Sequence, residues 1–514
     1  MSKRKKQTSN SGLSGLDIRS VALFRIIVGF NIIYNILQYR LFNVVPFYTD
    51  EGIVPFSVIE QGYGAPFSLL HYLPSATLIS LYFIICLLLA ALYLLGIKSR
   101  IVGPILFILF ASIINGNPVI SHGVEFLIEV SLFWGFFLPL DACFSVWPKS
   151  QKVKPLIVKG LATYGILLQI ALIYLTSFLT KTGDLWQSGQ TIFSITDDRT
   201  HAVGFAELLS SYPGFCAFLT YTALYLELFL AILIFFPLFN RYCRLIAAIG
   251  IVLLHTGLAL VLFVGPFHLI TLAFAVVLLP SFVWEKVNIA PKNFPLPIWK
   301  APPAPKVKGK KVVKEPPLPI WGYLWKGLVI VMMIWIVQKN FQKWKQESYL
   351  SQILNNMGPI GKLADLNPKQ ASPFTGLLQQ PWWLFAPNPH KDMGTIVLLA
   401  RTEQNETLDL LGDRILTISD DPQTGEPVFD KKIVNHFTSS RFVLSFYARR
   451  YLQVFPPELF QRWTDFEYER WKKQHPDQKL LELRMYYYSN YTTLERGQLN
   501  RKKNLALMHT KVIN

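Results

Sequence analysis

Long apolar segments recur along the first two thirds of this chain of 514 residues, and they constrain its fold more than any other feature. A helix needs about 20 mainly apolar residues to cross the ~30 Å hydrocarbon core of a bilayer. Hydrophobic residues make up 52% of the chain and charged residues only 16%, a balance that excludes an ordinary soluble protein of this size. The sequence therefore predicts a polytopic, all-α membrane bundle of about nine transmembrane helices, with the third and eighth short for a full span. Their approximate limits are 19–38, 75–95, 101–114, 124–140, 156–180, 214–239, 244–264, 267–284 and 319–338.

Positive charge falls in alternate loops and orients the predicted helices. Lys and Arg close to helix ends are retained on the cytoplasmic side of a membrane. Loop 41–71 contains neither Lys nor Arg, and loop 115–123 contains no charged residue. The pattern places the basic loops inside, and an odd number of spans then places the chain after residue 338 outside. The basic loops are 3–6, 98–100, 149–159, 241–244 and 286–314.

Spans and charges together divide the chain into five segments. These are a basic cytoplasmic N-terminus, a transmembrane domain, a basic Pro/Lys-rich cytoplasmic linker, a last transmembrane helix and an extracytoplasmic domain. In that order they cover residues 1–18, 19–284, 285–318, 319–338 and 339–514.

The C-terminal segment changes its pattern along its length. Alternating apolar runs at 395–401 and 480–488 predict strands. Helix-like sequence covers 339–366 and the aromatic-rich stretch 440–473. We therefore expect a small mixed α/β domain at the outer end of the bundle.

The formal net charge of +18 raises the question of nucleic-acid binding. The positive residues lie in clusters beside the predicted helices, where anionic lipid headgroups are the expected partner rather than nucleic acid. The sequence contains no P-loop, GxGxxG, HExxH or GxSxG motif, so nucleotide binding and the common hydrolase chemistries lack their usual support. The four cysteines show no CxxC spacing and predict neither a metal site nor a disulfide framework.

Lys181 ends the fifth apolar segment at the predicted outer face and is followed by Gly183 and Trp186. An ammonium at the edge of hydrocarbon loses part of its hydration, which lowers its pKa and makes the free amine available near neutral pH. Such an amine is suited to proton abstraction. The alternative is a lysine that extends from a helix end toward water, which is common at membrane boundaries.

Four further ionisable residues are predicted at the same face or inside the spans. His122 precedes the fourth span, and His268 begins the eighth. Glu227 and His255 lie within the sixth and seventh spans. Ionisable groups inside a membrane are costly and usually face the bundle interior or a cavity, so a buried polar pocket is expected. For Glu227 and His255, a structural hydrogen bond to a neighbouring helix is equally consistent with the sequence.

Arg25 lies inside the first span and is expected to have a structural role. It would pair either with Glu129 or with backbone carbonyls. The sequence leaves both pairings open.

An ordered set of motifs extends over most of the chain. The motifs resemble those of the vitamin K-dependent gamma-carboxylase family, whose bacterial relatives contain the horizontally transferred transmembrane (HTTM) domain. The resemblance implies a carboxylase-like transmembrane domain over 19–284. The motifs are LFR at 23–25, YTDEG at 48–52, FLPL at 137–140, Lys181 followed by Trp186 and Gly189, GPF at 265–267 and WWLFAPNP at 382–389.

The resemblance also implies an activity and a set of site residues. The activity is that of a gamma-glutamyl carboxylase, a carbon–carbon lyase that couples epoxidation of reduced vitamin K by O₂ to glutamyl γ-proton removal and CO₂ addition. Lys181 would be the catalytic base, and His122 would donate a hydrogen bond to an oxyanion. No metal is implied. The implied cofactor-binding residues are Trp186, His255, His268 and Glu227.

The implied partners are membrane lipid, a naphthoquinol among the spans and a glutamate-containing protein or peptide on the extracytoplasmic side. The expected location is the bacterial inner membrane. Because a fold does not determine turnover, the alternative is a non-catalytic quinone- or lipid-binding protein on the same scaffold. A transporter is disfavoured, since the halves of the sequence show no repeat. For His122, a loop histidine without a role is also consistent with the sequence.

Overall fold

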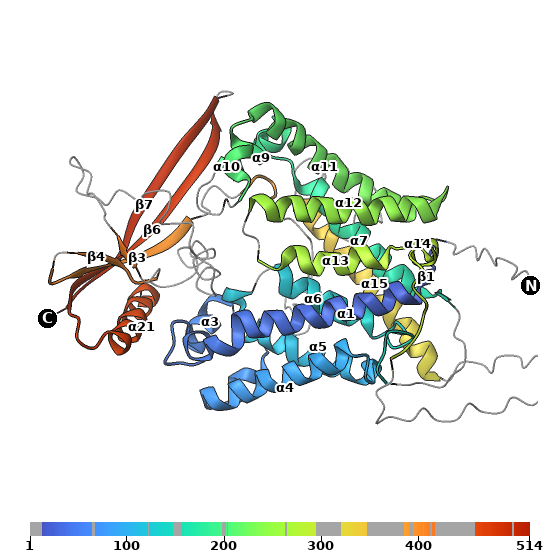
Figure 1. The fold of residues 1–514 in the computed structure, drawn as a ribbon, viewed down its shortest axis with the longest axis horizontal. Helices are drawn as coiled ribbons and strands as arrows, with labels where there is room; N and C mark the ends of the chain where they lie inside the picture. The colour runs from blue at the N-terminus through green and yellow to red at the C-terminus, as the bar shows by residue number, and fades with distance from the viewer. Residues whose placement is uncertain are drawn as a thin grey trace, which may run out of the picture.

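A computed structural model shows a bundle of helices with a β-sheet beside one of its ends (Figure 1). The bundle comes from the first part of the chain and from helix α15 (Ile320–Gln346), and the sheet comes from the C-terminal part. The structure describes residues 13–63, 67–121, 123–147, 156–197, 202, 204–262, 265–294, 320–346, 385–389, 394–404, 406–411, 414–416, 458–495 and 498–513.

Seven helical segments among the described residues are long and apolar enough to cross a membrane. This confirms a polytopic helical membrane protein. The first segment combines helix α1 (Ile18–Asn35), a π-helical turn (Ile36–Arg40), a short 3₁₀ turn (Leu41–Asn43) and helix α2 (Val44–Tyr48). The others lie in α4 (Ala76–Leu94), α5 (Ser99–Gly116), α7 (Leu161–Thr180), α11 (Pro213–Phe235), α12 (Asn240–Val261) and α15 (Ile320–Gln346).

Two of the nine predicted spans are shorter helices. The fourth becomes α6 (Gly123–Gly135, 13 residues) and the eighth becomes α13 (Phe267–Val277, 11 residues). Of the 13 residues of α6, 11 are buried, because neighbouring helices surround it. A helix enclosed by protein does not have to match the thickness of the bilayer. The third predicted span, expected to be short, is the 18-residue helix α5.

Short elements connect these helices. The connecting segments contain the short helices α3 (Phe56–Tyr63), α8 (Asp184–Gln187), α9 (Thr191–Asp197), α10 (Ala206–Ser210) and α14 (Ser281–Lys286). Two further 3₁₀ turns cover Leu69–Tyr72 and Pro118–Ile120. Strands β1 (Leu16–Asp17) and β2 (Ile157–Val158) form a two-stranded antiparallel pair.

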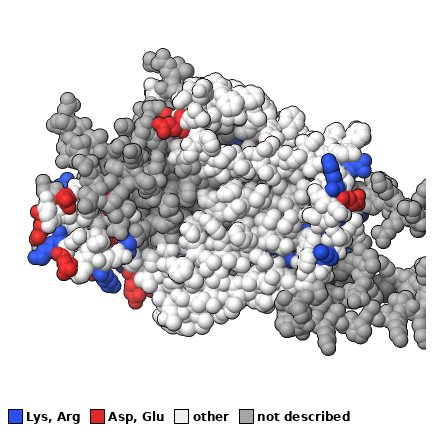
Figure 2. All heavy atoms as spheres, in the orientation of Figure 1, with Lys and Arg blue, Asp and Glu red and all other residues white. Residues whose placement is uncertain are grey.

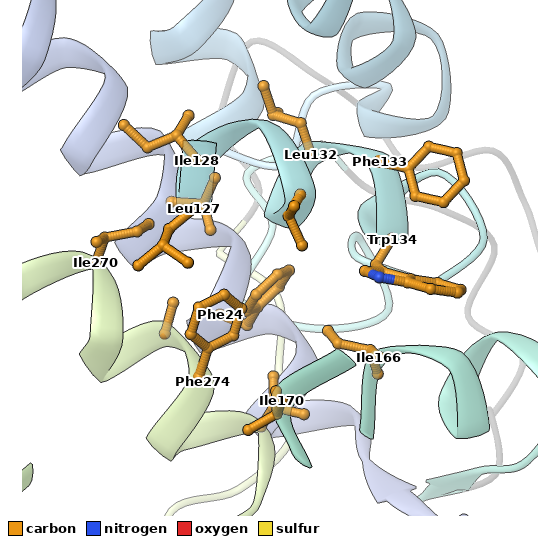
Figure 3. Packing of buried hydrophobic residues seen from close by; sticks show 14 of the residues in the cluster. Phe24, Leu127, Ile128, Leu132, Phe133, Trp134, Ile166, Ile170, Ile270 and Phe274 are labelled. Atoms are coloured by element: carbon orange, nitrogen blue, oxygen red, sulfur yellow. The ribbon is translucent and has the colours of Figure 1, made fainter. Parts of the chain in front are cut away.

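The centre of the bundle is a continuous apolar core (Figure 3). Phe24 of α1 meets Phe274 of α13 and Leu127 of α6 within this core. Helices α6 and α7 approach so closely that a methyl group added at Gly165 would lie 2.1 Å from the ring of Trp134. Large rings therefore fill the space that a small residue leaves on the facing helix.

Buried arginines tie backbone segments together at the end of the bundle near the N-terminus. Arg25 donates to the carbonyl oxygens of Leu140 (2.8 Å) and Phe144 (2.5 Å). The structure thus supports backbone carbonyls, rather than Glu129, as its partners. Arg244 likewise donates to the carbonyls of Gly15 and Leu13.

The C-terminal part forms a five-stranded antiparallel sheet with one helix. The strand order is β5-β4-β3-β6-β7, and α21 (Glu458–Gln474) packs against β6 and β7. The predicted strands 395–401 and 480–488 lie within β3 and β6, but β6 is longer than predicted and β7 was not predicted. The strands are β3 (Gly394–Thr402), β4 (Thr407–Asp409), β5 (Arg414–Leu416), β6 (Leu480–Glu495) and β7 (Gln498–Val512).

The sheet region and the bundle share an apolar cluster. It joins Phe47, near the end of the first segment, and Ile53, just after it, to Trp463 of α21 and Ile396 of β3. Arg462 of α21 also donates to the carbonyls of Asp50 (2.5 Å) and Gly52 (3.2 Å). The C-terminal part is therefore packed on the bundle.

Charged side chains are concentrated at the two ends of the molecule. On the face shown in Figure 2, the described surface of the bundle between these ends is almost entirely uncharged. Side chains exposed along α11 and α12 include Phe218, Phe229, Ile246 and Leu253. Such an apolar belt fits the hydrocarbon layer of a membrane.

Candidate functional site

Lys181 lies at the end of α7, directly after its last helical residue, Thr180. The side chain does not extend toward water, since Lys181 is only 6% exposed. Its ammonium nitrogen donates to Oε1 of Glu227 at 2.5 Å. The same nitrogen lies 4.6 Å from the centroid of the Trp186 ring. The lysine is thus enclosed by a carboxylate and an aromatic face.

Two opposing effects act on the pKa of Lys181, which lies outside the span Leu161–Thr180. Burial favours the neutral amine and lowers the pKa. The negative charge of Glu227 and its hydrogen bond favour the ammonium and raise the pKa. Burial is the larger effect, so the pKa lies below the ordinary value for lysine. Because its pKa is lowered, Lys181 loses its proton more readily than an exposed lysine and can act as a base.

Glu227 reaches the site from the middle of α11. Its Oε1 also accepts a hydrogen bond from Ser177 Oγ, at 2.9 Å, which links α11 to α7. Its second oxygen, Oε2, is buried and has no hydrogen-bond partner among the described residues. The hydrogen bond to a neighbouring helix, one of the two roles that the sequence left open for Glu227, is therefore present, and Oε2 is left to bind a ligand.

His255 of α12 extends the polar cluster along α7. Its Nε2 lies 3.0 Å from the hydroxyl of Tyr174, and its ring meets the Phe267 ring edge-on at 5.1 Å between centroids. Lys181 and His268 are both close enough to act electrostatically on the His255 ring. Within the described part of the chain, the Nδ1 atoms of His255 and His268 are buried without a hydrogen-bond partner. The predicted residues Lys181, Trp186, Glu227, His255 and His268 thus come from four separate regions of sequence into one neighbourhood.

Trp186 stands in the short helix α8 that follows Lys181. It is 3% exposed, and its indole N–H donates to the carbonyl of Phe385 at 2.8 Å. The ring packs with Leu224 of α11 and with Leu262, which follows α12. The Trp186 ring is therefore held in one position beside Lys181.

The last span supplies residues that the sequence analysis did not identify. Thr176 of α7 donates to the side-chain oxygen of Asn340 in α15, and Trp344 Nε1 donates to Thr176 Oγ1 at 3.1 Å. The helix α15 continues past the predicted limit of 338 and carries both partners. The sequence does indicate a polar face on α7, since Tyr174, Ser177 and Lys181 follow the i, i+3, i+7 spacing of one helix face.

His122 lies outside the described residues, so its expected approach to Lys181 stays a prediction. The segment before it is described. Arg40 donates to the carbonyl of Ile120 at 3.2 Å, and Ser121 Oγ donates to the carbonyl of Asn117 at 3.1 Å. Arg40 is itself paired with Glu125 at 2.6 Å.

No protein-family model, curated protein or solved structure matches this chain.

Proposed function

We propose that the chain is a quinol-dependent membrane enzyme of the gamma-glutamyl carboxylase type, with the buried Lys181–Glu227 pair as its proton-accepting centre. The observation that carries the proposal is the environment of this pair. It combines a cation and a carboxylate 2.5 Å apart, an aromatic wall and unsatisfied polar atoms close by, all enclosed at one end of a helical bundle. Perturbed ionisable groups in an enclosed site are typical of catalytic centres.

The free polar atoms fit a ligand that carries hydroxyl groups on an aromatic ring. A buried polar atom without a partner costs about 1–3 kcal/mol. Glu227 Oε2 can accept a hydroxyl hydrogen, and the Nδ1 atoms of His255 and His268 can accept or donate one according to tautomer. A reduced naphthoquinone presents such hydroxyls, and its isoprenoid tail is soluble in the hydrocarbon around the bundle. We therefore propose reduced vitamin K or a related quinol as the co-substrate.

Lys181 would remove the hydroxyl proton of this ring. Nζ as a free amine takes the proton, and the resulting ammonium is then held by Glu227 Oε1 and by the Trp186 face. Enclosure keeps water away from the new charges and strengthens these contacts. The bound quinol would supply, with O₂, the strong base needed to remove a glutamyl γ-proton before CO₂ adds.

The proposed membrane topology follows the charge pattern of the loops. We propose nine membrane-embedded segments, in which α6 and α13 are short partners of the seven long ones. The Lys181 end of the bundle and the domain 339–514 would face the extracytoplasmic side of a bacterial inner membrane. A glutamate-containing peptide would approach from that side, and His122 would assist as a hydrogen-bond donor.

The proposal is tested by quinol epoxidation. Purified protein in nanodiscs receives reduced vitamin K, oxygen, bicarbonate and a glutamate peptide, and epoxide and labelled CO₂ incorporation are measured. Lys181→Ala should lower epoxide formation by at least about a hundredfold, as expected for a lost general base. The matched control is Lys286→Ala, an exposed lysine of α14, which should retain wild-type activity.

Lys181→Arg separates the amine from the carboxylate as the base. Arginine can keep the ion pair with Glu227 but does not lose its proton. Loss of epoxide in this variant identifies the lysine amine as the base. Full activity in Lys181→Arg would instead assign the proton to Glu227.

The alternative is a quinone- or lipid-binding protein without turnover. One observation favours it, namely that the bond to Glu227 stabilises the charged, non-basic form of Lys181. Quinol binding by well-folded protein, with no epoxide from any variant or from wild type, would establish this alternative.

A further inference from the structure

A short segment from beyond the last span, residues 385–389, lies against the turn that follows Lys181. Trp186 Nε1 donates to the carbonyl of Phe385 at 2.8 Å. The backbone N–H of Gly183 donates to the carbonyl of Pro387 at 3.0 Å. About two hundred residues of sequence separate the two sides, so only the tertiary fold brings them together.

Asn388 makes the side-chain contacts between the same two segments. Its Oδ1 accepts from the backbone N–H of Leu185 at 3.1 Å, and its Nδ2 donates to Asp184 Oδ1 at 2.5 Å. One amide side chain thus uses both its acceptor and its donor on the first turn of α8. The two groups are the carbonyl oxygen and the amino group of one carboxamide, which among the other side chains only glutamine carries, and glutamine is one methylene longer.

Gly183 leaves the space that Asn388 occupies. A methyl group added at Gly183 would lie 2.1 Å from Asn388 Oδ1 and 2.2 Å from its Cγ. The backbone of Gly183 is extended, with φ −74° and ψ 163°, so it does not require glycine. The side chain of Asn388 therefore explains the need for a small residue at this position.

Helix α8, which these contacts stabilise, is too short to be stable by itself. α8 covers only Asp184–Gln187, and a helix of one turn is unstable alone because nucleation is unfavourable. Its first N–H groups have no partners inside the helix. Asn388 and Pro387 supply acceptors for two backbone N–H groups at this end.

We infer that Asn388 is a positioning residue of the site: it fixes α8, and so holds the Trp186 ring over Lys181. Phe385 completes the attachment by accepting from the indole N–H and by packing in the same apolar cluster as Trp186. The catalytic consequence rests on the proposed function, but the structural claim does not. If Trp186 moves by about 1 Å, catalysis is expected to fall on the order of a hundredfold.

The test observes Trp186 directly. Full-length protein in nanodiscs is labelled with 5-fluorotryptophan, and the Trp186 ¹⁹F resonance is assigned by its absence in Trp186→Phe. In Asn388→Ala the Trp186 resonance should shift or broaden by more than its linewidth. The resonances of tryptophans remote from the site, such as Trp134 and Trp284, should stay in place and show that the fold is intact.

A side-chain exchange provides the rescue. Asn388→Asp removes the donor and sets two carboxylates against each other, whereas the double variant Asp184→Asn with Asn388→Asp restores the bond with donor and acceptor reversed. Asp184→Asn alone keeps a carbonyl oxygen that can accept from Asn388. The resonance should move in Asn388→Asp, stay close to its wild-type position in Asp184→Asn, and return in the double variant. Asn240→Ala is the matched control, because Asn240 also makes two side-chain hydrogen bonds, to the carbonyls of Ile234 and Phe236 at the end of α11. An unmoved Trp186 resonance in Asn388→Ala, or no recovery in the double variant, overturns the inference.

Gly183→Ala gives a second and independent check. In the wild type this change should displace Asn388 and move the Trp186 resonance. In an Asn388→Ala background the obstructing atoms are gone, so adding Gly183→Ala should have little further effect. Equal effects in both backgrounds would contradict the contact.

These outcomes are separate from those of the proposed function. Protein that forms no epoxide can still show the ¹⁹F response, which would leave Asn388 as a positioning residue in a binding site. Protein that forms epoxide at the wild-type rate in Asn388→Ala, with Trp186 unmoved, would refute the positioning role and leave the carboxylase proposal intact.

Discussion

Lys181 and Glu227 share one hydrogen bond in a buried setting, so the proton affinity of each depends on the other. An isolated buried lysine would readily lose its proton, but the neighbouring carboxylate opposes this loss. Such a pair combines two properties that a reversible proton acceptor needs. Burial lowers the pKa of the amine, so the neutral amine can accept a proton. The ammonium that forms is already within hydrogen-bond distance of Glu227.

Glu227→Gln tests this balance through the pH dependence of activity. The change keeps the size of the side chain and removes its negative charge. Because Glu227 raises the pKa of Lys181, its removal lowers that pKa further. The acidic limb of the kcat/KM profile for epoxidation, which reports the free amine, should therefore move to lower pH.

The control for this prediction is Glu207→Gln, which changes an acidic residue in α10 rather than at the site. Its profile should match that of the wild type. An acidic limb that stays in place or moves to higher pH in Glu227→Gln would show that Lys181 does not govern it.

At the scale of the elements, α7 organises both the core and the site. One part of this helix packs Ile166 and Ile170 into the central core. The part nearest Lys181 presents hydroxyl groups to α11, α12 and α15, through Ser177, Tyr174 and Thr176. The position of the site therefore depends on the packing of α7 against its neighbours.

Gly165→Ala should weaken that packing. The added methyl group meets the Trp134 ring of α6 at 2.1 Å, and Trp134 is fully buried. Overpacking of this kind destabilises by about 1–3 kcal/mol. We expect a lower midpoint of thermal unfolding, measured in one detergent for all variants.

Gly257→Ala is the matched control, because a methyl group added at Gly257 of α12 meets no atom within 4 Å. Its unfolding midpoint should equal or exceed that of the wild type. The double variant Gly165→Ala with Trp134→Phe should recover part of the loss, since the smaller ring gives space. A wild-type midpoint for Gly165→Ala would contradict the tight α6–α7 contact.

At the scale of the whole molecule, the described residues of the C-terminal part contact the bundle through several elements. Its α21 and β3 share an apolar cluster with residues at the end of the first segment and just after it. Its 385–389 segment holds the turn after Lys181. The sheet region and the Lys181 end of the bundle therefore lie on the same side of the hydrocarbon layer, whichever side of the cell membrane that is.

Sidedness itself is predicted from the loop charges and is open to direct test. Two exposed lysines at opposite ends serve as labelling sites, Lys473 of α21 and Lys286 of α14. The four native cysteines are buried and should give little background. In intact bacterial cells, a membrane-impermeant maleimide should label Lys473→Cys at once and Lys286→Cys only after permeabilisation. The reverse pattern would invert the proposed topology.

Much of the fold follows from the sequence because a bilayer imposes a simple local rule. A segment that crosses hydrocarbon has to be long, apolar and helical, and each of these properties can be read within a window of about 20 residues. This rule identified the seven long segments, and it placed Glu227 and His255 within them as polar exceptions. It gave the fourth segment a full span where the structure has the 13-residue α6, because a helix buried in protein looks as apolar as one that faces lipid, whereas the eighth, expected to be short, is the 11-residue α13. Strand β7 was missed because its Lys- and Arg-rich sequence lacks the alternating apolar pattern.

The sequence by itself determined that this is a multi-pass helical membrane protein and that Lys181 lies at the end of an apolar helix. Only the tertiary structure decided what surrounds that lysine. Glu227 is 46 residues away and Phe385 is 199 residues from Trp186, and no local pattern encodes such pairings. The physical reason is that hydrophobicity acts on each segment separately. Hydrogen bonds and ion pairs depend on distances of about 3 Å between specific atoms, and these distances exist only after the helices have packed.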